Sequence, residues 1–403
     1  MAVDYVQTLN PDNGLARSVR ILRPDGTNSF LWTVAVDIGQ ERLDGPDAGI
    51  DMSWVGAAGI RRAPTLARAA GEAVERSALI PGEGLASGGG LPLAPRGACW
   101  ADTSTVPALK AYAATRYERD GIEAAVAVPA AAVDFPPAPG VLDLFDPGPS
   151  GTAAGIDLAM AEKSAAKEII ERSSAMLGWD QPETALRYNL HGNGFCAQTL
   201  GLATAAAGQG VELELVLLRE PHGHAVWMAV AIDTRHMVVG AGLGLEQDPS
   251  QGVLRAVQES LQIRSLLINL KDFEGWRTVV PPITSEMARA RYWAADTSVA
   301  GIREWLDRIP RADRPPRSTA LSATQSDNQE RRRTWLDSLP GYTMVDLTPR
   351  LPPAIREMGW CAVKIFCDTL QPLRMSDALD WNVLNVPPIA KQHQGNARPH
   401  PFI

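Results

Sequence analysis

A short signature, Glu-x-x-Glu-Arg, constrains this chain most, because it occurs twice, at residues 72–76 and 168–172. Each copy lies in a stretch whose apolar residues recur at intervals of three and four, which predicts a helix. A third such stretch, at residues 253–264, carries Arg255, Glu259 and Gln262. Residues three or four apart share one face of a helix. The fold must therefore contain helices that present stacked polar groups, and two of these groups are carboxylate pairs.

Stacked carboxylates need a compensating positive charge. Their repulsion costs roughly 0.2–0.5 kcal/mol in water and more when they are buried. Arg76 and Arg172 could offset it, and so could a metal ion. Carboxylates that converge from separate helices suit hard cations such as Mg²⁺, which prefer oxygen ligands and bridge to phosphates. Such pairs are also common on solvated helix faces, and the spacing alone leaves that alternative open.

Composition narrows the class of protein. The chain has 403 residues and a formal net charge of −8, with no basic run of the kind that binds nucleic acid. Its four cysteines show neither a disulfide framework nor a metal-binding spacing. No apolar run reaches membrane-spanning length, and the first residues do not resemble a signal peptide. We expect a cytoplasmic protein with no nucleic-acid or membrane partner.

Strand-like runs and turns surround the signature helices, which indicates an α+β protein. Strands are predicted at residues 18–22, 30–36, 124–128, 211–218, 225–232, 237–239, 344–348 and 361–366, and glycine loops at 56–59 and 150–155. A glycine loop before a helix can expose backbone amides to a phosphate. Residues 311–334 are charged and poor in apolar side chains. We expect them to form a mobile loop within a single domain that spans residues 1–403.

The common nucleotide-binding and nucleophile signatures do not occur in the sequence. Leu245 stands where a dinucleotide fingerprint that starts at Gly240 needs its third glycine. No Gly-x-x-x-x-Gly-Lys-Ser/Thr segment occurs, which excludes a P-loop fold. No Ser/His/Asp or Cys/His arrangement can be recognised, so the sequence does not indicate a protein nucleophile.

Taken in order, these segments resemble the YcaO family of ATP-dependent enzymes that modify peptide backbones. Four parts carry the resemblance: residues 56–76, residues 150–172, residues 255–264, and a C-terminal part made of 346–348, 370–373 and Pro399-x-Pro401. In this order and spacing the four parts together are specific for the family, and they span nearly the whole chain. The resemblance implies a YcaO-type α+β fold, in which mixed sheets and flanking helices form an ATP site unrelated to the P-loop.

The resemblance also implies roles for individual residues. It assigns the binding of Mg²⁺ to Glu72, Glu75, Glu168, Glu171 and Glu259. It assigns the binding of ATP to Arg68, Glu72, Ser164, Arg255, Glu259, Gln262 and Arg264. It implies a functional C-terminal tail at residues 388–403, in which Pro399 and Pro401 direct the carboxylate of Ile403 into the site as a proton acceptor.

Several positions depart from the family pattern. Arg68 replaces a serine that often contacts the nucleotide, and Ser150-Gly151 lacks the usual intervening asparagine. Ile403 replaces the last proline of the tail, and Asp368-Thr369 stands where Pro-Gly is usual. None of these departures removes a residue that the resemblance assigns to Mg²⁺.

The implied activity is ATP-dependent cyclodehydration, which converts Cys, Ser or Thr residues of a ribosomally made precursor peptide into thiazolines or oxazolines. The resemblance also implies a leader-binding partner related to ubiquitin-activating enzymes, an FMN-dependent azoline dehydrogenase, and a hetero-oligomer or homodimer. Two alternatives stay open. One is backbone thioamidation at the same ATP site, and the other is a non-catalytic scaffold subunit of a peptide-modifying complex.

Overall fold

The computed structural model describes residues 3–25, 30–39, 54–101, 110–119, 121, 123–136, 144–190, 195–218, 224–272, 279–312, 335–379 and 398–403. The predicted mobile loop lies outside the described residues from position 313 onward. Residues 388–397 of the predicted tail lie outside them too, whereas residues 398–403 are described.

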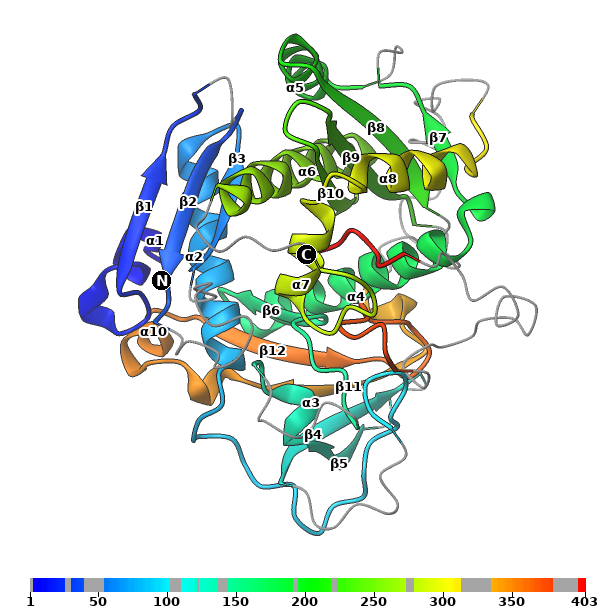
Figure 1. Cartoon of the computed structure of the whole chain (residues 1–403). Helices are drawn as coiled ribbons and strands as arrows, with labels where there is room; N and C mark the ends of the chain where they lie inside the picture. The colour runs from blue at the N-terminus through cyan, green and yellow to red at the C-terminus, as the bar shows by residue number, and fades with distance from the viewer. Residues whose placement is uncertain are drawn as a thin grey trace, which may run out of the picture.

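Helices and strands are interspersed along the chain (Figure 1). The α-helices are α1 (Tyr5–Thr8), α2 (Arg62–Leu79), α3 (Ala130–Val133), α4 (Leu158–Asp180), α5 (Ala197–Gly208), α6 (Pro249–Lys271), α7 (Glu286–Trp293), α8 (Ser298–Asp307) and α10 (Pro353–Glu357). The strands are β1 (Ser18–Leu22), β2 (Trp32–Asp37), β3 (Trp54–Gly59), β4 (Ala111–Glu118), β5 (Glu123–Pro129), β6 (Thr152–Gly155), β7 (Leu186–Tyr188), β8 (Val211–Leu218), β9 (Val226–Asp233), β10 (Val238–Leu245), β11 (Gly341–Asp346) and β12 (Cys361–Phe366).

These strands form three sheets with the orders β1-β2-β3, β10-β9-β8-β7 and β5-β4-β11-β12-β6. Each pairing between named strands is antiparallel. The three signature stretches are helical, as predicted, and each packs on a different sheet: α2 on β3, α4 on β6 and β12, and α6 on β10. In Figure 1 these three helices border the middle of the molecule. The α+β class is thus confirmed.

Alternate glycines allow α6 to lie directly on β10. The sequence predicts that this strand stops at Val239, but it continues through the glycine run to Leu245. A Cβ atom at Gly242 would lie 2.4 Å from the Ala256 carbonyl oxygen, and one at Gly244 would lie 1.9 Å from that of Gly252. Only glycine fits such a close approach of two backbones. The run therefore serves helix–sheet packing, and it holds the third signature helix against the sheet.

The two predicted glycine loops contain strands, which corrects the prediction from sequence. Residues 56–59 belong to β3, and residues 152–155 form β6, which is paired with β12. Small residues such as Ala57 and Ala153 favour the prediction of a loop from the sequence, yet both are buried under the helix that follows. Each signature helix thus comes directly after a strand that anchors its first turn.

The sequence of α4 explains its length and its orientation. The side chain of Asp157 caps the helix by accepting a hydrogen bond from Met160 N at 2.7 Å. One helix face is fully buried and built largely from small residues, including Ala161, Ala165 and Ala166. Because the backbone can approach its neighbours closely on that face, Glu171 is buried, while Glu168 and Arg172 are half-buried.

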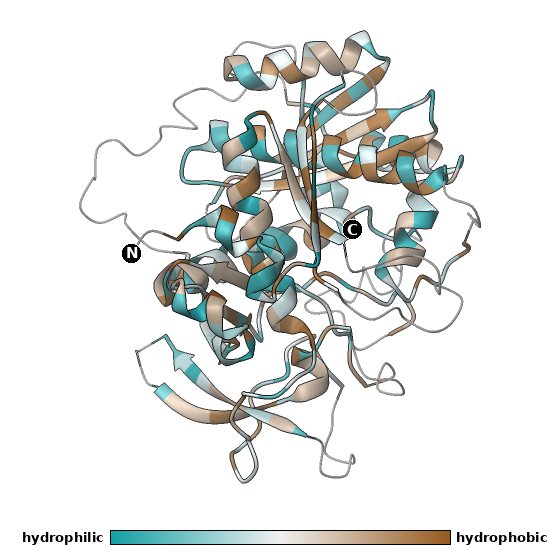
Figure 2. Cartoon of the chain, turned by 90° about the vertical axis from the view of Figure 1, so that its left-hand side faces the viewer, coloured by the Kyte–Doolittle hydropathy of each residue, from teal (hydrophilic) through white to brown (hydrophobic). Residues whose placement is uncertain are grey.

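Amphipathic character differs among the helices: it is pronounced in α2 and α8 and weak in α4, α5 and α7. Figure 2 shows hydrophilic and hydrophobic residues interspersed along them, as expected when one face of each helix covers a sheet. None of the helices in the described ranges combines the length and the apolar character that crossing a membrane requires.

Candidate functional site

The five signature glutamates lie close enough together for their charges to influence one another or a shared arginine. The charges of Glu72 and Glu168, from α2 and α4, both act on Glu75. The charge of Arg172 on α4 is stabilised by Glu168, by Glu259 on α6 and by Glu171. The three helices therefore place their carboxylates and arginines in one cluster, as the sequence predicts.

Backbone amides fix one oxygen of three of these carboxylates. Gly151 N donates to Glu168 Oε2 at 3.2 Å. The last residues of β10 hold the other two, since Leu245 N donates to Glu171 Oε1 at 2.6 Å and Leu243 N donates to Glu259 Oε2 at 2.8 Å. A carboxylate held in this way keeps its orientation and can still offer its second oxygen to a ligand.

The signature arginines neutralise part of the negative charge. Arg76 Nε lies 3.0 Å from Glu72 Oε1, and Arg172 Nε lies 3.4 Å from Glu168 Oε1, each one helical turn apart. Arg255 pairs with Glu246 at 3.2 Å instead. Burial alone would lower the pKa of Arg255, but Glu171 and Glu259 outweigh it and raise that pKa. Each of the three arginines thus remains charged, and Arg255 does so with its side chain 45% exposed at the surface.

The surroundings of Glu75 oppose its ionisation, and these arginines do not offset that effect. Burial raises the pKa of Glu75 well above its ordinary value, and the neighbouring Glu72 and Glu168 raise it further, against Arg76 and Arg172. Burial likewise raises the pKa of Glu168 and of Glu259. Inside a protein such an excess of carboxylates favours bound protons or a bound cation.

The donor set fits Mg²⁺, a hard cation that takes carboxylate oxygens. With the side chains as they stand, no three acidic, histidine or cysteine side chains of the described residues are arranged to hold a metal ion. Glu72 and Glu168 each turn one oxygen toward an arginine.

The residues assigned to the nucleotide meet at β3. Gln262 Oε1 accepts a hydrogen bond from Ala58 N at 2.9 Å, and the guanidinium of Arg68 donates to the carbonyl oxygen of Ala58. Burial first and the charge of Arg255 next lower the pKa of Arg68. Ser164 is half-buried on α4, one turn before Glu168. Arg68 and Gln262 thus meet at Ala58 of β3, between α2 and α6, whereas Ser164 belongs to α4.

Arg264 lies in a different environment from the other predicted ATP contacts. Its side chain is 1% exposed and pairs with the equally buried Asp233, Nη2 to Oδ2 at 2.5 Å. Asp233 also accepts from His236, Nδ1 to Oδ2 at 2.8 Å. This buried ion pair gives Arg264 a stabilising role in the structure.

This placement of Arg264 predicts a loss of stability on mutation. Arg264→Met is expected to lower the free energy of unfolding by about 3–5 kcal/mol, because it leaves the charge of Asp233 buried and uncompensated. Arg303→Met is the matched control, since Arg303 pairs with Glu212 on the surface at 3.0 Å and should cost at most about 1 kcal/mol. Urea denaturation of both variants measures the difference, and equal losses would contradict this assignment.

The C-terminal residues are anchored inside the molecule. Pro399, His400 and Pro401 are buried, and the carbonyl oxygen of His400 accepts from Trp293 Nε1 at 2.9 Å and from Arg289 Nη1 at 3.3 Å. Burial, followed by the charges of Arg289 and Arg374, holds the pKa of His400 well below its ordinary value, and Arg172 of the cluster contributes as well. The tail therefore lies within electrostatic reach of the glutamate site.

Lys364 is a charged residue near the site that the sequence prediction missed. Its side chain is fully buried under α4, and Nζ donates to the Gly148 carbonyl oxygen at 2.6 Å. Burial lowers the pKa of Lys364 to about 8, although Cys99 and Glu168 act in the opposite direction. The signal in the sequence is a lysine inside the otherwise apolar strand at residues 361–366. Lys364 thus supports the loop whose Gly151 amide orients Glu168.

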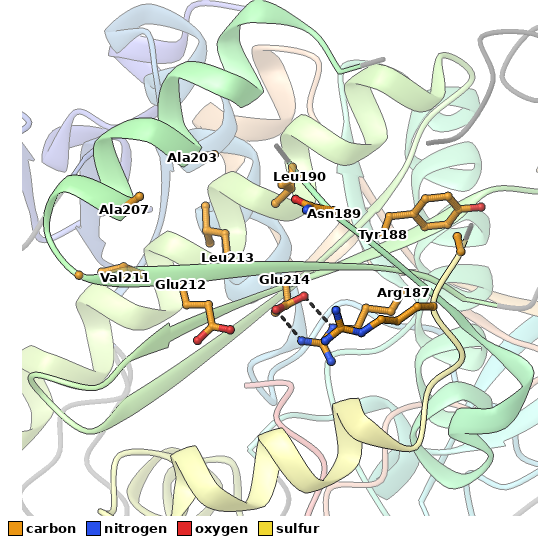
Figure 3. A pocket seen from close by; sticks show the side chains of 13 residues that line it. Arg187, Tyr188, Asn189, Leu190, Ala203, Ala207, Val211, Glu212, Leu213 and Glu214 are labelled. Atoms are coloured by element: carbon orange, nitrogen blue, oxygen red, sulfur yellow. Dashed lines mark hydrogen bonds and ion pairs between the residues drawn. The ribbon is translucent and has the colours of Figure 1, made fainter. Parts of the chain in front are cut away.

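A cavity of ≈570 Å³ lies away from this cluster, between α5 and the strands β7 and β8 (Figure 3). Arg187 Nη2 pairs with Glu214 Oε1 at 2.6 Å beside it. Glu212 and Glu214 point to one side of β8 and Leu213 to the other. None of the residues that the sequence assigns to ATP or Mg²⁺ lines this cavity, so its size does not mark the predicted site.

Comparison with known proteins gives a family and a fold. Residues 106–371 match the family model YcaO, which is described as YcaO cyclodehydratase, ATP- and Mg²⁺-binding. No curated protein sequence matches the chain.

Three solved structures are similar in fold. The YcaO protein of Methanopyrus kandleri bound with AMPPCP and Mg²⁺ is 17% identical, with a TM-score of 0.61, over 95% of this chain and 92% of that one. A heterocyclase in complex with substrate and cofactor is 16% identical, with a TM-score of 0.66. The match covers 99% of this chain but 56% of the heterocyclase. The E. coli microcin synthetase McbBCD complex with pro-MccB17 bound contains a chain that is 12% identical, with a TM-score of 0.62, over 96% of both chains.

Proposed function

The chain belongs to the YcaO family, whose model matches residues 106–371 of its 403, and we propose that it is an ATP- and Mg²⁺-dependent cyclodehydratase of a ribosomally made peptide. One observation carries the proposal. Five glutamates from three helices meet in a cluster in which burial, Glu72 and Glu168 oppose the ionisation of Glu75 more than the nearby arginines favour it. This is the environment that a divalent cation and a polyphosphate require.

The cluster divides into metal-side and nucleotide-side residues. Mg²⁺ would be held by Glu72, Glu75, Glu168, Glu171 and Glu259. ATP would be contacted by Glu72, Glu259, Arg68, Ser164, Arg255 and Gln262. Bound Mg²⁺ would neutralise the charge of the phosphoryl group that is transferred. Arg264 is left out of this set because its guanidinium is committed to Asp233.

The proposed reaction closes a five-membered ring in the peptide backbone. A Cys, Ser or Thr side chain attacks the carbonyl carbon of the preceding residue, and the carbonyl oxygen takes the γ-phosphoryl group of ATP. Phosphate then leaves with that oxygen, and the protons of the side chain and of the amide nitrogen are lost to bases. Positioning and charge neutralisation supply most of the catalysis in such a step. This fits a site built from carboxylates and arginines, into which the tail with Pro399, Pro401 and Ile403 would bring a proton acceptor.

We propose a peptide substrate and separate partner proteins in the cytoplasm. A leader-binding protein related to ubiquitin-activating enzymes would deliver the precursor, and an FMN-dependent dehydrogenase would oxidise the azolines. The similar folds of a heterocyclase in complex with substrate and of a chain in the McbBCD complex support this assembly. Backbone thioamidation and a scaffold role remain the competing functions.

Peptide mass spectrometry distinguishes these functions. The chain is incubated with candidate partner proteins, a Cys-rich precursor peptide, ATP and Mg²⁺. We expect the peptide to lose the mass of one water for each ring formed, and we expect Glu168→Gln to abolish this loss. Glu214→Gln, which removes a carboxylate from the β7–β8 cavity, is the control and should retain activity. Exchange of an oxygen for sulfur would indicate thioamidation, and the absence of ATP turnover in every combination would indicate the scaffold.

A further inference from the structure

The cavity between α5, β7 and β8 has no part in the proposed ATP site, and it lies along an open strand edge. β7 pairs with β8 at residues 215–217 only, whereas β9 pairs with β8 along its whole length. No described strand covers the β7 side of β8 at residues 211–214, and these residues line the cavity. An uncovered strand edge presents backbone N–H and C=O groups with which another extended chain can pair.

The outer edge of β7 is already covered. Arg187 N donates to the Pro310 carbonyl oxygen and Ala312 N donates to the Arg187 carbonyl oxygen, each at 2.9 Å. Within the described ranges, the open stretch on this side of the sheet is therefore the first half of β8. An extended segment of about four residues, roughly 13 Å long, matches it in length.

Small side chains give this edge its space. α5 faces the cavity with Ala203 and Ala207, and Leu190 and Leu213 add apolar surface. The cavity volume of ≈570 Å³ is within the range of roughly 300–1,000 Å³ that is usual for binding sites. In Figure 3, Leu213 points to the side of β8 on which α5 lies. Because alternate side chains of a strand share one face, an apolar residue of an added strand would fit between Leu213 and α5.

One arginine at the cavity is available to a ligand. Glu214 is held by Arg187 through hydrogen bonds of 2.6 and 2.8 Å, and Glu212 pairs with Arg303, so both glutamates are already neutralised. Arg311 also lines the cavity, is exposed, and forms no ion pair with a described residue. A carboxylate of the ligand is the complementary group for this guanidinium.

We propose that this cavity binds an extended, acidic segment of the precursor peptide, which pairs with β8 as an added strand. Its backbone bonds to residues 211–214, an apolar side chain contacts Leu213 and α5, and an acidic side chain pairs with Arg311. Glu212 and Glu214 take no part, because arginines hold them. None of the residues assigned to ATP or Mg²⁺ lines the cavity, so the bound segment is held there and not modified there. This inference rests on the proposed function, since it takes the substrate to be a peptide.

Hydrogen exchange of the full chain tests the strand pairing. The probe is a synthetic peptide in which valine and aspartate alternate. We expect the outward amides of residues 211–214 to exchange rapidly in the chain alone and about tenfold more slowly with the peptide bound. Of two probes N-methylated at alternate positions, one should lose this protection and the other keep it, because only alternate N–H groups face the partner strand. Slow exchange in the chain alone, or equal behaviour of the two N-methylated probes, overturns the proposal.

Variants of α5 test the cavity itself. Ala207→Phe fills it and should weaken binding of the labelled probe about tenfold or more, as measured by fluorescence anisotropy. Ala205→Phe is the matched control, since Ala205 is also exposed on α5 but does not line the cavity, and its affinity should equal that of the wild type. Equal binding by Ala207→Phe and the wild type overturns the proposal.

The charge is tested with a second pair of variants. Arg311→Gln should weaken binding of the valine–aspartate probe about tenfold and leave a valine–asparagine probe unaffected. Arg308→Gln, which removes an exposed arginine outside the cavity, is the control. Equal losses for the acidic and the neutral probe would contradict the role of Arg311.

Turnover separates this inference from the proposed function. With the precursor peptide, Ala207→Phe should raise KM and leave kcat unchanged, because the reacting residues bind elsewhere. An unchanged KM together with lost binding of the probe would assign the cavity to a strand of a partner protein and overturn the proposal. A wild-type chain that binds the probe but neither turns over ATP nor modifies any peptide would overturn the proposed function instead.

Discussion

Replacing Glu75 by glutamine is expected to abolish peptide modification and at the same time to stabilise the metal-free protein. Glu75 is the carboxylate with the most strongly unfavourable surroundings, because burial and the charges of Glu72 and Glu168 oppose its ionisation. A glutamine of the same shape removes this unfavourable charge and one metal ligand together. Activity should fall by roughly 100-fold or more. The free energy of unfolding without metal should rise by about 0.5–2 kcal/mol, as is common when a strained functional site is relieved.

The same pKa shift predicts the direction of the pH dependence. The folded protein holds the Glu75 proton more tightly than the unfolded chain does, because its pKa is raised on folding. Stability of the metal-free wild type should therefore decline as the pH rises from the ordinary glutamate pKa through the raised value. Mg²⁺ affinity should increase over the same interval, since the metal requires ionised carboxylates.

Urea denaturation at a series of pH values, with and without Mg²⁺ and nucleotide, measures both effects. Glu75→Gln should reduce the loss of stability that accompanies rising pH. The control Glu212→Gln, which alters a surface pair with Arg303, should leave that loss unchanged. A Glu75→Gln protein that is both fully active and no more stable than the wild type would contradict this account of the cluster.

Replacing Arg289 by methionine is expected to be the most destabilising single change in the region of the tail. Arg289 is 1% exposed and donates to the carbonyl oxygens of Arg374, Met375 and His400, and it also pairs with Asp377. Methionine fills a similar volume but removes the hydrogen bonds that Arg289 donates to these buried acceptors, and it leaves the Met375 carbonyl oxygen without that donor. A loss of about 3–5 kcal/mol in the free energy of unfolding follows from breaking such a buried network. Activity should fall as well, because the tail would no longer be held against α7.

Trp293→Phe is the graded comparison for this experiment. It removes one hydrogen bond to the His400 carbonyl oxygen and keeps most of the ring, so about 1 kcal/mol should be lost. Thermal and chemical denaturation of the two variants give the ratio of the effects. If Arg289→Met cost no more than Trp293→Phe, the tail would not depend on the arginine.

The sequence predicts the signature helices because their apolar periodicity is long and regular. It also predicts most strands in their positions, and the helical spacing places each glutamate pair on one face. The limits of strands that consist of glycine and alanine are not predicted, because such residues look alike in loops and under a tightly packed helix. The run at Gly240–Gly244 can be understood only once α6 is seen to lie on it.

Side-chain partners from distant elements are likewise not predicted. Arg264 has the spacing of a site residue, yet its guanidinium points to Asp233 of β9 because that carboxylate is the buried acceptor within reach. Lys364 lies outside every signature, and only the packing of α4 on β12 brings its charge toward the cluster. Periodicity thus specifies which residues share a helix face, whereas tertiary packing determines what that face meets.

A crystal structure of the chain with a non-hydrolysable ATP analogue and Mg²⁺ would test the central claim most directly. We predict Mg²⁺ at about 2.0–2.1 Å from carboxylate oxygens of both α2 and α4, bridged to the phosphates. Nucleotide bound elsewhere, for example in the cavity between β7 and β8, with both signature ion pairs intact, would contradict the assignment of the glutamate cluster as the active site.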